Sequence, residues 1–133
     1  MTRENSLKLK QELKVLAIQI RQQKSTVKEN NRAYSKEEAL VGPLSWYPYP
    51  EKQKELAKLY GPLCSSQHGL TKIKQEFRAK HVVYCLARGR LIEQIEPNAD
   101  REHFHWYEVH KSLVPKYAKE YGLYEDERIN KAS

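Results

Sequence analysis

Apolar residues near the N-terminus follow the spacing that a helix needs to bury one face. They lie alternately four and three positions apart, and Gln23 fills the one place where an apolar residue is missing. Such a heptad pattern is typical of a helix that packs along another helix. The members of this seam are Leu9, Leu13, Leu16, Ile20 and Val27.

The seam predicts one long amphipathic helix over residues 1–30. Ser6 or Asn5 can cap its start, and neither proline nor glycine interrupts it before Asn30. Its apolar face can pack on the rest of the chain, or it can form an oligomer or partner seam in which Gln23 fixes the register. Cations coat the rest of the helix: Lys8, Lys10, Lys14, Arg21, Lys24 and Lys28.

Residues 31–50 have the composition of a linker rich in proline and aromatic residues. Pro48 and Pro50 favour an extended chain and keep Tyr47 and Tyr49 out of a helix. The rings can clamp the connection to its own core, stack on nucleic-acid bases or fill a partner's groove. The residues predicted to stack are Trp46, Tyr47 and Tyr49.

A compact helical domain is predicted over residues 51–122, followed by a polar tail over 123–133. Its first helix is expected to stop at Gly61-Pro62, and a turn then leads to a helix that starts at Leu70. Branched and aromatic residues over 82–87 also fit a strand, but the helical pattern enters continuously from Leu70.

After Gly89 a short apolar segment ends at Pro97, and a last helix is predicted to break or kink at Pro115 and end at Gly122. The expected fold class is therefore mainly α: a small helical bundle with a long N-terminal amphipathic helix and a linker rich in proline and aromatic residues.

The chain is basic, with 24 Lys and Arg against 17 Asp and Glu and a formal charge of +7. This favours an anionic partner and argues against an acidic mimic of DNA. The stretch from Leu70 to Arg90 carries a single acid, Glu76. Its cations are the predicted nucleic-acid-binding residues, acting mainly on the phosphate backbone: Lys72, Lys74, Arg78, Lys80, Arg88 and Arg90.

Gly89 allows two interpretations. It can cap the helix before it in a left-handed conformation, or it can be the pivot of a corner at which two arginines meet phosphate. The flanking Arg88 and Arg90 either face an open surface or pair with Glu93 and Glu96.

The spacing of Leu86, Gly89 and Ile95 resembles the helix-turn-helix modules of bacterial regulators and sigma factors, with Gln94 in the place of their glutamate. This resemblance implies that residues 100–113 form the helix that reads DNA.

The sequence predicts no enzyme, no cofactor and no metal site. It lacks the metalloprotease, phosphate-loop and nucleophile-elbow motifs, and Cys64 and Cys85 lack the spacing of zinc ligands. On a helix His103 and His105 point to opposite sides and cannot hold one ion. His110 lies on an apolar stripe and is expected to be a packed core residue.

The N-terminus lacks the apolar core of a signal peptide, and no run is long enough to cross a membrane. A cytoplasmic, nuclear or nucleoid protein without membrane contact is therefore expected. Two functions follow. The first is nucleic-acid binding, to DNA or RNA. The second is a protein-interaction, accessory or inhibitor module of the phage or virus type, which docks on a protein partner or forms a homodimer through its N-terminal helix and aromatic linker.

Overall fold

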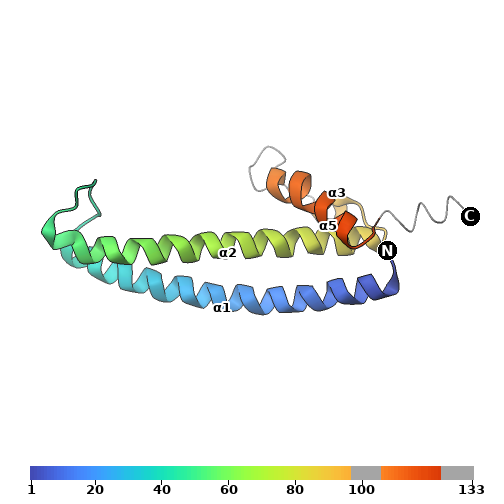
Figure 1. The fold of residues 1–133 in the computed structure, drawn as a ribbon, viewed down its shortest axis with the longest axis horizontal. Coiled ribbons are helices and arrows are strands. Elements are labelled where there is room, and N and C mark those ends of the chain that lie inside the picture. Colours follow the sequence, from blue (N-terminus) through green and yellow to red (C-terminus); the bar gives the residue numbers. More distant parts are fainter. Residues whose placement is uncertain (97–105, 124–133) are drawn as a thin grey trace, which may run out of the picture. The chain divides into compact units, whose positions relative to one another are not determined.

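The computed structural model describes residues 1–96 and 106–123. Within these ranges every regular element is a helix, which confirms the predicted mainly α fold (Figure 1). The chain divides into two compact units, to which both long helices contribute. The core unit comprises Met1–Ile18 and Ile73–Ser133, and the hairpin unit comprises Gln19–Lys72.

The first helix, α1, spans Arg3–Val41 and starts earlier than the sequence suggested. The Thr2 hydroxyl accepts a hydrogen bond from the Asn5 backbone N–H at 3.1 Å, which is the geometry of an N-cap. The predicted caps, Ser6 or Asn5, are therefore wrong. The Asn5 side chain instead donates to the Tyr121 carbonyl at 3.0 Å and ties the start of α1 into the core unit.

The far end of α1 corrects the predicted boundary at Asn30, because the helix continues to Val41. Gly42 then adopts a φ of 82° and donates its N–H to the Glu38 carbonyl at 2.8 Å. This left-handed cap is accessible to glycine at no steric cost.

Burial along α1 explains the extra length. One row of seam positions stays apolar and half-buried to the end of the helix: Leu13, Ile20, Val27, Tyr34 and Val41. The other row turns polar after the buried Leu16 and continues as Gln23, Asn30 and Glu37, all half-buried. The apolar periodicity fades at these positions although the same face of the helix stays covered.

A short 3-10 helix, η1 (Glu51–Gln53), leads directly into α2, which spans Lys54–Ala87. The predicted stop at Gly61-Pro62 and the turn after it are wrong, since Pro62 lies inside α2. A proline inside a helix costs about 3 kcal/mol. Apolar burial offsets this cost, because Leu56 and Leu63 are buried on either side of the proline.

The helical alternative for residues 82–87 is confirmed, because this segment lies in α2.

In the hairpin unit α1 and α2 run antiparallel, side by side (Figure 1). A polar layer crosses their seam at the buried Ser66. Gln23 donates to the Ser66 carbonyl at 2.9 Å, and Asn30 donates to the Ser66 hydroxyl at 3.2 Å and to the Pro62 carbonyl at 3.3 Å. Sliding one helix past the other would break these bonds, so the layer fixes the register of the hairpin.

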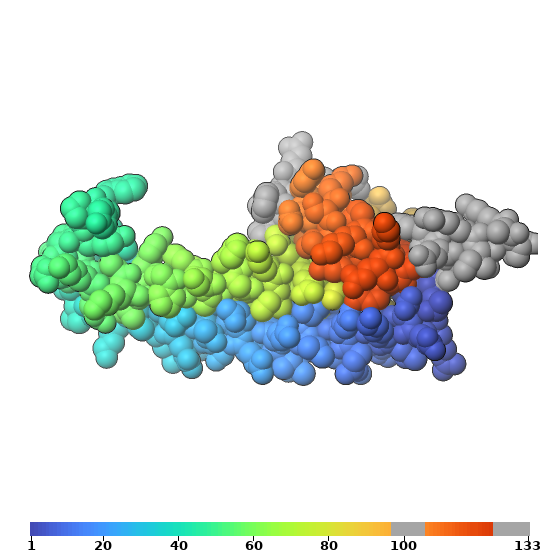
Figure 2. Space-filling view, in the orientation of Figure 1, coloured from blue at the N-terminus to red at the C-terminus, as the bar shows by residue number. Residues whose placement is uncertain are grey.

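The loop between α1 and α2 is held by one buried side chain, Gln53, which is only 4% exposed. Its carbonyl oxygen accepts from the Ser45 N–H at 3.0 Å and from the Ser45 hydroxyl at 2.7 Å. Its amide donates to the carbonyls of Val41 at 3.0 Å and Pro43 at 2.8 Å. These bonds order the loop, residues 42–50, which projects from the helices and is called the knob here (Figure 2).

The core unit contains the larger apolar cluster. It joins α1 and α2 to the helices of the C-terminal part: the π-helix η2 (Tyr107–Leu113) and α5 (Val114–Glu120). Its buried members are Leu9, Ala79, Val82, Val83, Val109, Val114, Tyr117, Ala118 and Tyr121.

Of the predicted break or kink at Pro115, the break is wrong, because the chain stays helical from η2 into α5. A proline in an α-helix clashes with the carbonyl four residues before it, and the wider π turn lies over those residues. The Val114 N–H accordingly donates to the carbonyl of Val109, five residues earlier. The hydrogen-bond pattern therefore changes from π-helical to α-helical at Val114, and the chain stays helical to Glu120.

Gly89 ends α2 as a left-handed cap with a φ of 83°. The Gly89 N–H donates to the Leu86 carbonyl at 3.0 Å, and the Arg90 N–H donates to the Cys85 carbonyl at 3.2 Å. This pair of bonds is the Schellman motif. The left-handed conformation of Gly89 is thereby confirmed, and both interpretations of this glycine share it. The single turn α3 (Ile92–Ile95) follows.

No helix in the described ranges is both long enough and apolar enough to span a lipid bilayer.

Replacing Gln53 tests the anchoring of the loop. We expect Gln53→Ala to lower the free energy of unfolding by about 2 kcal/mol, because the Ser45 groups and two carbonyls lose a partner. It should also make residues 42–50 more sensitive to limited proteolysis. Urea unfolding and proteolysis measure the two effects. Gln67→Ala, at an exposed position of α2, is the matched control, and equal behaviour of both variants would contradict the assignment.

Candidate nucleic-acid interface

Lys80, one of the predicted phosphate contacts, is buried in the core unit. Its ammonium group lies 3.3 Å from the Glu12 carboxylate and 3.1 Å from that of Glu76, and it sits 5.0 Å from the centre of the Tyr117 ring. Burial lowers the pKa of Lys80, but the hydrogen bonds and charges of the two glutamates outweigh it and raise the pKa above its usual value. Lys80 is therefore a structural cation that links α1 to α2.

Arg78 also has an internal partner. Its Nε donates to Glu96 at 2.5 Å, and the other oxygen of Glu96 bonds the buried ring of His110. Burial raises the pKa of Glu96, but the hydrogen bonds from Arg78 and His110 outweigh it and hold that pKa below its ordinary value of 4.5. The structure thus pairs Glu96 with Arg78, where the sequence suggested Arg88 or Arg90.

His110 was expected to be a packed core residue, and it is buried in the π-helix η2. The sequence did not reveal its carboxylate partner, because Glu96 lies fourteen positions earlier on a different element.

Arg88 and Arg90 lie at the exposed end of α2, on either side of Gly89. The Arg88 guanidinium bonds the Tyr84 hydroxyl at 3.1 Å and lies over that ring, while Arg90 donates to the Gln94 carbonyl at 3.2 Å. Both retain donors for an outside acceptor, since a guanidinium has five N–H groups.

Lys72 and Lys74 are exposed and have no ion pair with any residue in the described ranges. Lys72 belongs to the hairpin unit and Lys74 to the core unit. Of the six predicted cations, Arg78 and Lys80 have internal partners, while Lys72, Lys74, Arg88 and Arg90 are exposed.

The segment that the helix-turn-helix resemblance makes the reading helix, 100–113, falls partly outside the described residues. Its described end is the π-helix η2. His103 and His105, which were not expected to hold a metal, also lie outside them. Among the residues that the structure covers, no group of His, Cys, Asp or Glu is arranged to hold a metal ion.

The predicted oligomer seam lies against the chain itself. Leu9 and Leu16 are buried, and Leu13, Ile20 and Val27 are half-buried. These burials support packing within the chain, which was the simpler of the two alternatives for this face.

A basic row on α1 of the hairpin unit was missed as a site, although most of its members were noted as a coat. Its spacing of three, four and four residues keeps one face of the helix for about 16 Å. All four side chains are exposed, and none has an ion pair or hydrogen bond with a described residue. The basic row consists of Arg21, Lys24, Lys28 and Arg32.

Trp46 and Tyr47 are the most exposed large apolar side chains of the hairpin unit. Trp46 is 94% exposed and Tyr47 83%, while Tyr49 is half-buried and meets Tyr47 edge to face at 5.8 Å. The alternative in which these rings clamp the loop does not apply to Trp46 and Tyr47. Gln53 anchors the loop through the backbone instead.

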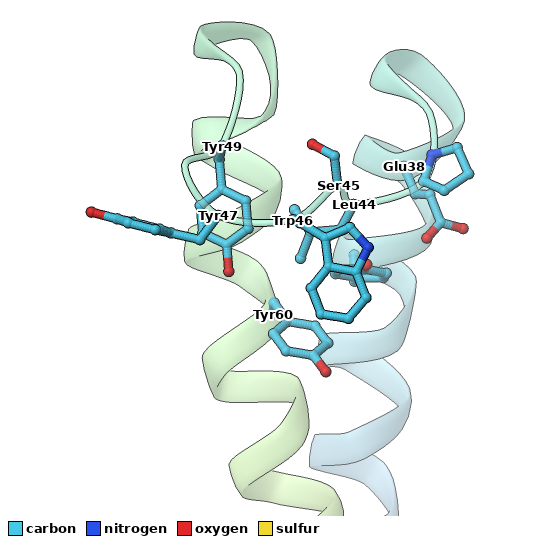
Figure 3. Close-up of a pocket in the computed structure, with 9 residues that line it drawn as sticks. Glu38, Leu44, Ser45, Trp46, Tyr47, Tyr49 and Tyr60 are labelled. Atoms are coloured by element: carbon cyan, nitrogen blue, oxygen red, sulfur yellow. The ribbon is translucent and has the colours of Figure 1, made fainter.

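A pocket of about 530 Å³ opens beside the knob (Figure 3). In Figure 3 the rings of Trp46, Tyr49 and Tyr60 surround it, and the Tyr47 ring extends away from them. The lining residues are Tyr34, Glu38, Pro43, Leu44, Ser45, Trp46, Tyr47, Tyr49 and Tyr60.

Two tyrosines of this pocket have a pKa above the usual value for tyrosine. Burial, and then the charge of Glu38 and a hydrogen bond to its carboxylate, raise the pKa of Tyr34. A hydrogen bond with Cys64 raises the pKa of Tyr60. The rings of Tyr34 and Tyr60 lie 6.0 Å apart, one from each helix.

No protein-family model, no curated protein and no solved structure matches this chain.

The pairing of Glu96 predicts a dependence of stability on pH. A carboxyl group whose pKa falls on folding stabilises the fold above its unfolded pKa, and this contribution is lost as the pH drops through the folded pKa. We expect Glu96→Gln to lower the free energy of unfolding by about 2 kcal/mol at neutral pH, with the difference from wild type shrinking in acid.

Urea unfolding across a pH series measures this difference, with Glu120→Gln at an exposed position as control. A difference that does not change with pH would contradict the ionised pair.

Proposed function

We propose that this chain binds nucleic acid through the basic row of the hairpin unit. The observation that carries the proposal is that Arg21, Lys24, Lys28 and Arg32 share one exposed helix face and form no ion pair with a described residue. Arg78 and Lys80 no longer belong to the candidate site, because each is paired with internal glutamates.

The row suits a phosphate backbone. Arginines stand at both ends of it, and a guanidinium can grip one phosphate with two parallel hydrogen bonds. Side chains three and four residues apart lie close enough to contact phosphates along the same strand. Lys72, an exposed cation of the same unit, adds to the positive potential of that unit.

The exposed rings favour a single strand. Unpaired bases present faces on which aromatic side chains stack, and this stacking tolerates any sequence. Tyr47 and Trp46 offer such faces in the same unit as the basic row. We therefore propose that the chain acts by binding rather than by catalysis. The proposed location is the cytoplasm, the nucleus or the nucleoid.

A protein-interaction module is the second candidate, and one observation favours it. In the core unit Leu7, Val15 and Ile18 of α1 are exposed at positions that share one side of the helix. This apolar strip is distinct from the seam and offers a surface on which a protein partner can dock.

Neutralising the row tests the proposed function. We expect Lys24→Gln with Lys28→Gln to weaken binding to single-stranded DNA or RNA, because two phosphate contacts are lost. The slope of log K against log salt should fall by about 0.7 for each lysine. Fluorescence anisotropy with labelled oligonucleotides, titrated across salt concentrations, measures both quantities.

The matched control is Lys54→Gln with Lys58→Gln. It removes the same charge at the same spacing from the same unit, but these lysines are paired with Glu51 and Glu55. Equal losses in the two double variants would show only a net-charge effect and contradict the row, and no binding by the wild-type protein would contradict the function.

A further inference from the structure

The pocket beside the knob combines two chemical features that attract the same kind of ligand. The faces of aromatic rings carry negative potential, and Tyr34, Trp46, Tyr49 and Tyr60 all contribute to its lining. Glu38 adds a carboxylate to that lining. Aromatic faces around a carboxylate form the arrangement that proteins use to recognise organic cations.

Glu38 shares one face of α1 with Tyr34, because Tyr34 lies one helical turn before it. The charge of Glu38 is close enough to the Tyr34 hydroxyl to raise the pKa of that tyrosine. A carboxylate has acceptor sites for the N–H groups of a cation. In Figure 3 Glu38 lies on the α1 side of the Trp46 ring, and the Tyr60 ring lies on the α2 side.

The rings of the core unit show what this chain does with aromatic faces elsewhere. Lys80 lies over Tyr117, Arg88 over Tyr84 and Lys111 over Trp106. Among the described residues, no cation of the chain lies over a ring of the knob pocket. The pocket thus presents aromatic faces and a carboxylate without an internal cation.

We propose that the knob pocket binds an organic cation, an alkylammonium or guanidinium group, between the rings of Trp46 and Tyr60 with its charge matched by Glu38. The site is distinct from the basic row, because the ligand has the opposite charge to a phosphate. Trp46 is 94% exposed without a ligand, so a bound cation would cover its indole ring. The proposal does not depend on nucleic-acid binding.

Trp46 supplies the readout. The chain has two tryptophans, Trp46 and Trp106, and the second lies in the core unit. In a Trp106→Phe background the emission of the full-length protein therefore reports on Trp46 alone. We expect choline to change this emission in a saturable manner at constant ionic strength, and sodium chloride to have no such effect.

Three probes define the ligand. The neutral isostere of choline, in which a tert-butyl group replaces the trimethylammonium group, has the same shape without the charge and is expected to bind about tenfold more weakly. Nα-acetyl-lysine amide, which keeps its ε-ammonium group, represents an amino-acid source of the cation. Phosphocholine represents a headgroup source. Equal binding of choline and its neutral isostere would overturn the proposal.

Glu38→Gln tests the carboxylate. We expect it to weaken choline binding about tenfold while leaving the circular dichroism spectrum unchanged. Glu29→Gln removes the same charge from an exposed position of α1 outside the pocket and should leave binding unchanged. Tyr60→Leu should weaken binding and Tyr60→Phe should preserve it.

Two outcomes would also overturn the proposal. One is no saturable change with any of the cations. The other is equal weakening by Glu38→Gln and Glu29→Gln. Neither outcome bears on the basic row, whose test uses oligonucleotides, so failure of this proposal and failure of the proposed function are separable.

Discussion

The polar layer at Ser66 sets the arrangement of the hairpin unit. Apolar seam residues alone tolerate a shift of one heptad, because every heptad offers a similar surface. Gln23 and Asn30 remove this freedom, since each has a partner only in one register. Polar residues in this layer bury less apolar surface than leucines would, but they define the alignment of α1 with α2. That alignment determines which lining residues of α1 and α2 meet at the knob.

Pairing with internal carboxylates separates the cations of the chain into two kinds. Lys80 is buried between two carboxylates and a tyrosine ring, where an unpaired charge would be costly, and Arg78 is half-buried and paired with Glu96. The four cations of the basic row are exposed and form no ion pair with a described residue. Charge density along the sequence does not distinguish these kinds, because pairing partners come from distant segments: Glu12 for Lys80 and Glu96 for Arg78.

Much of the fold was predictable from the sequence. The heptad seam, the cap at Gly89 and the helical state of residues 82–87 all follow from local pattern and glycine chemistry. The length of α1 was not predictable from apolar periodicity, because Asn30 is a polar member of the seam. Pro62 was misread as a stop, since burial of leucines on both sides is a tertiary effect.

The candidate sites were less predictable. The aromatic residues of the knob were identified from composition, but the pocket also needs Tyr34, Glu38 and Tyr60, which lie on two helices that were expected to end elsewhere. Gln53 carries no sequence signal for its role as the anchor of the loop, because its five hydrogen-bonding contacts depend on the path of the backbone around it.

The central claim is that the exposed basic row, and not the Lys72–Arg90 stretch, is the surface that binds a polyanion. Backbone amide chemical shifts recorded during titration with a short single-stranded oligonucleotide test it most directly. We expect saturable shifts at residues 21–32. Shifts confined to residues 72–90, or no saturable shift, would contradict the claim.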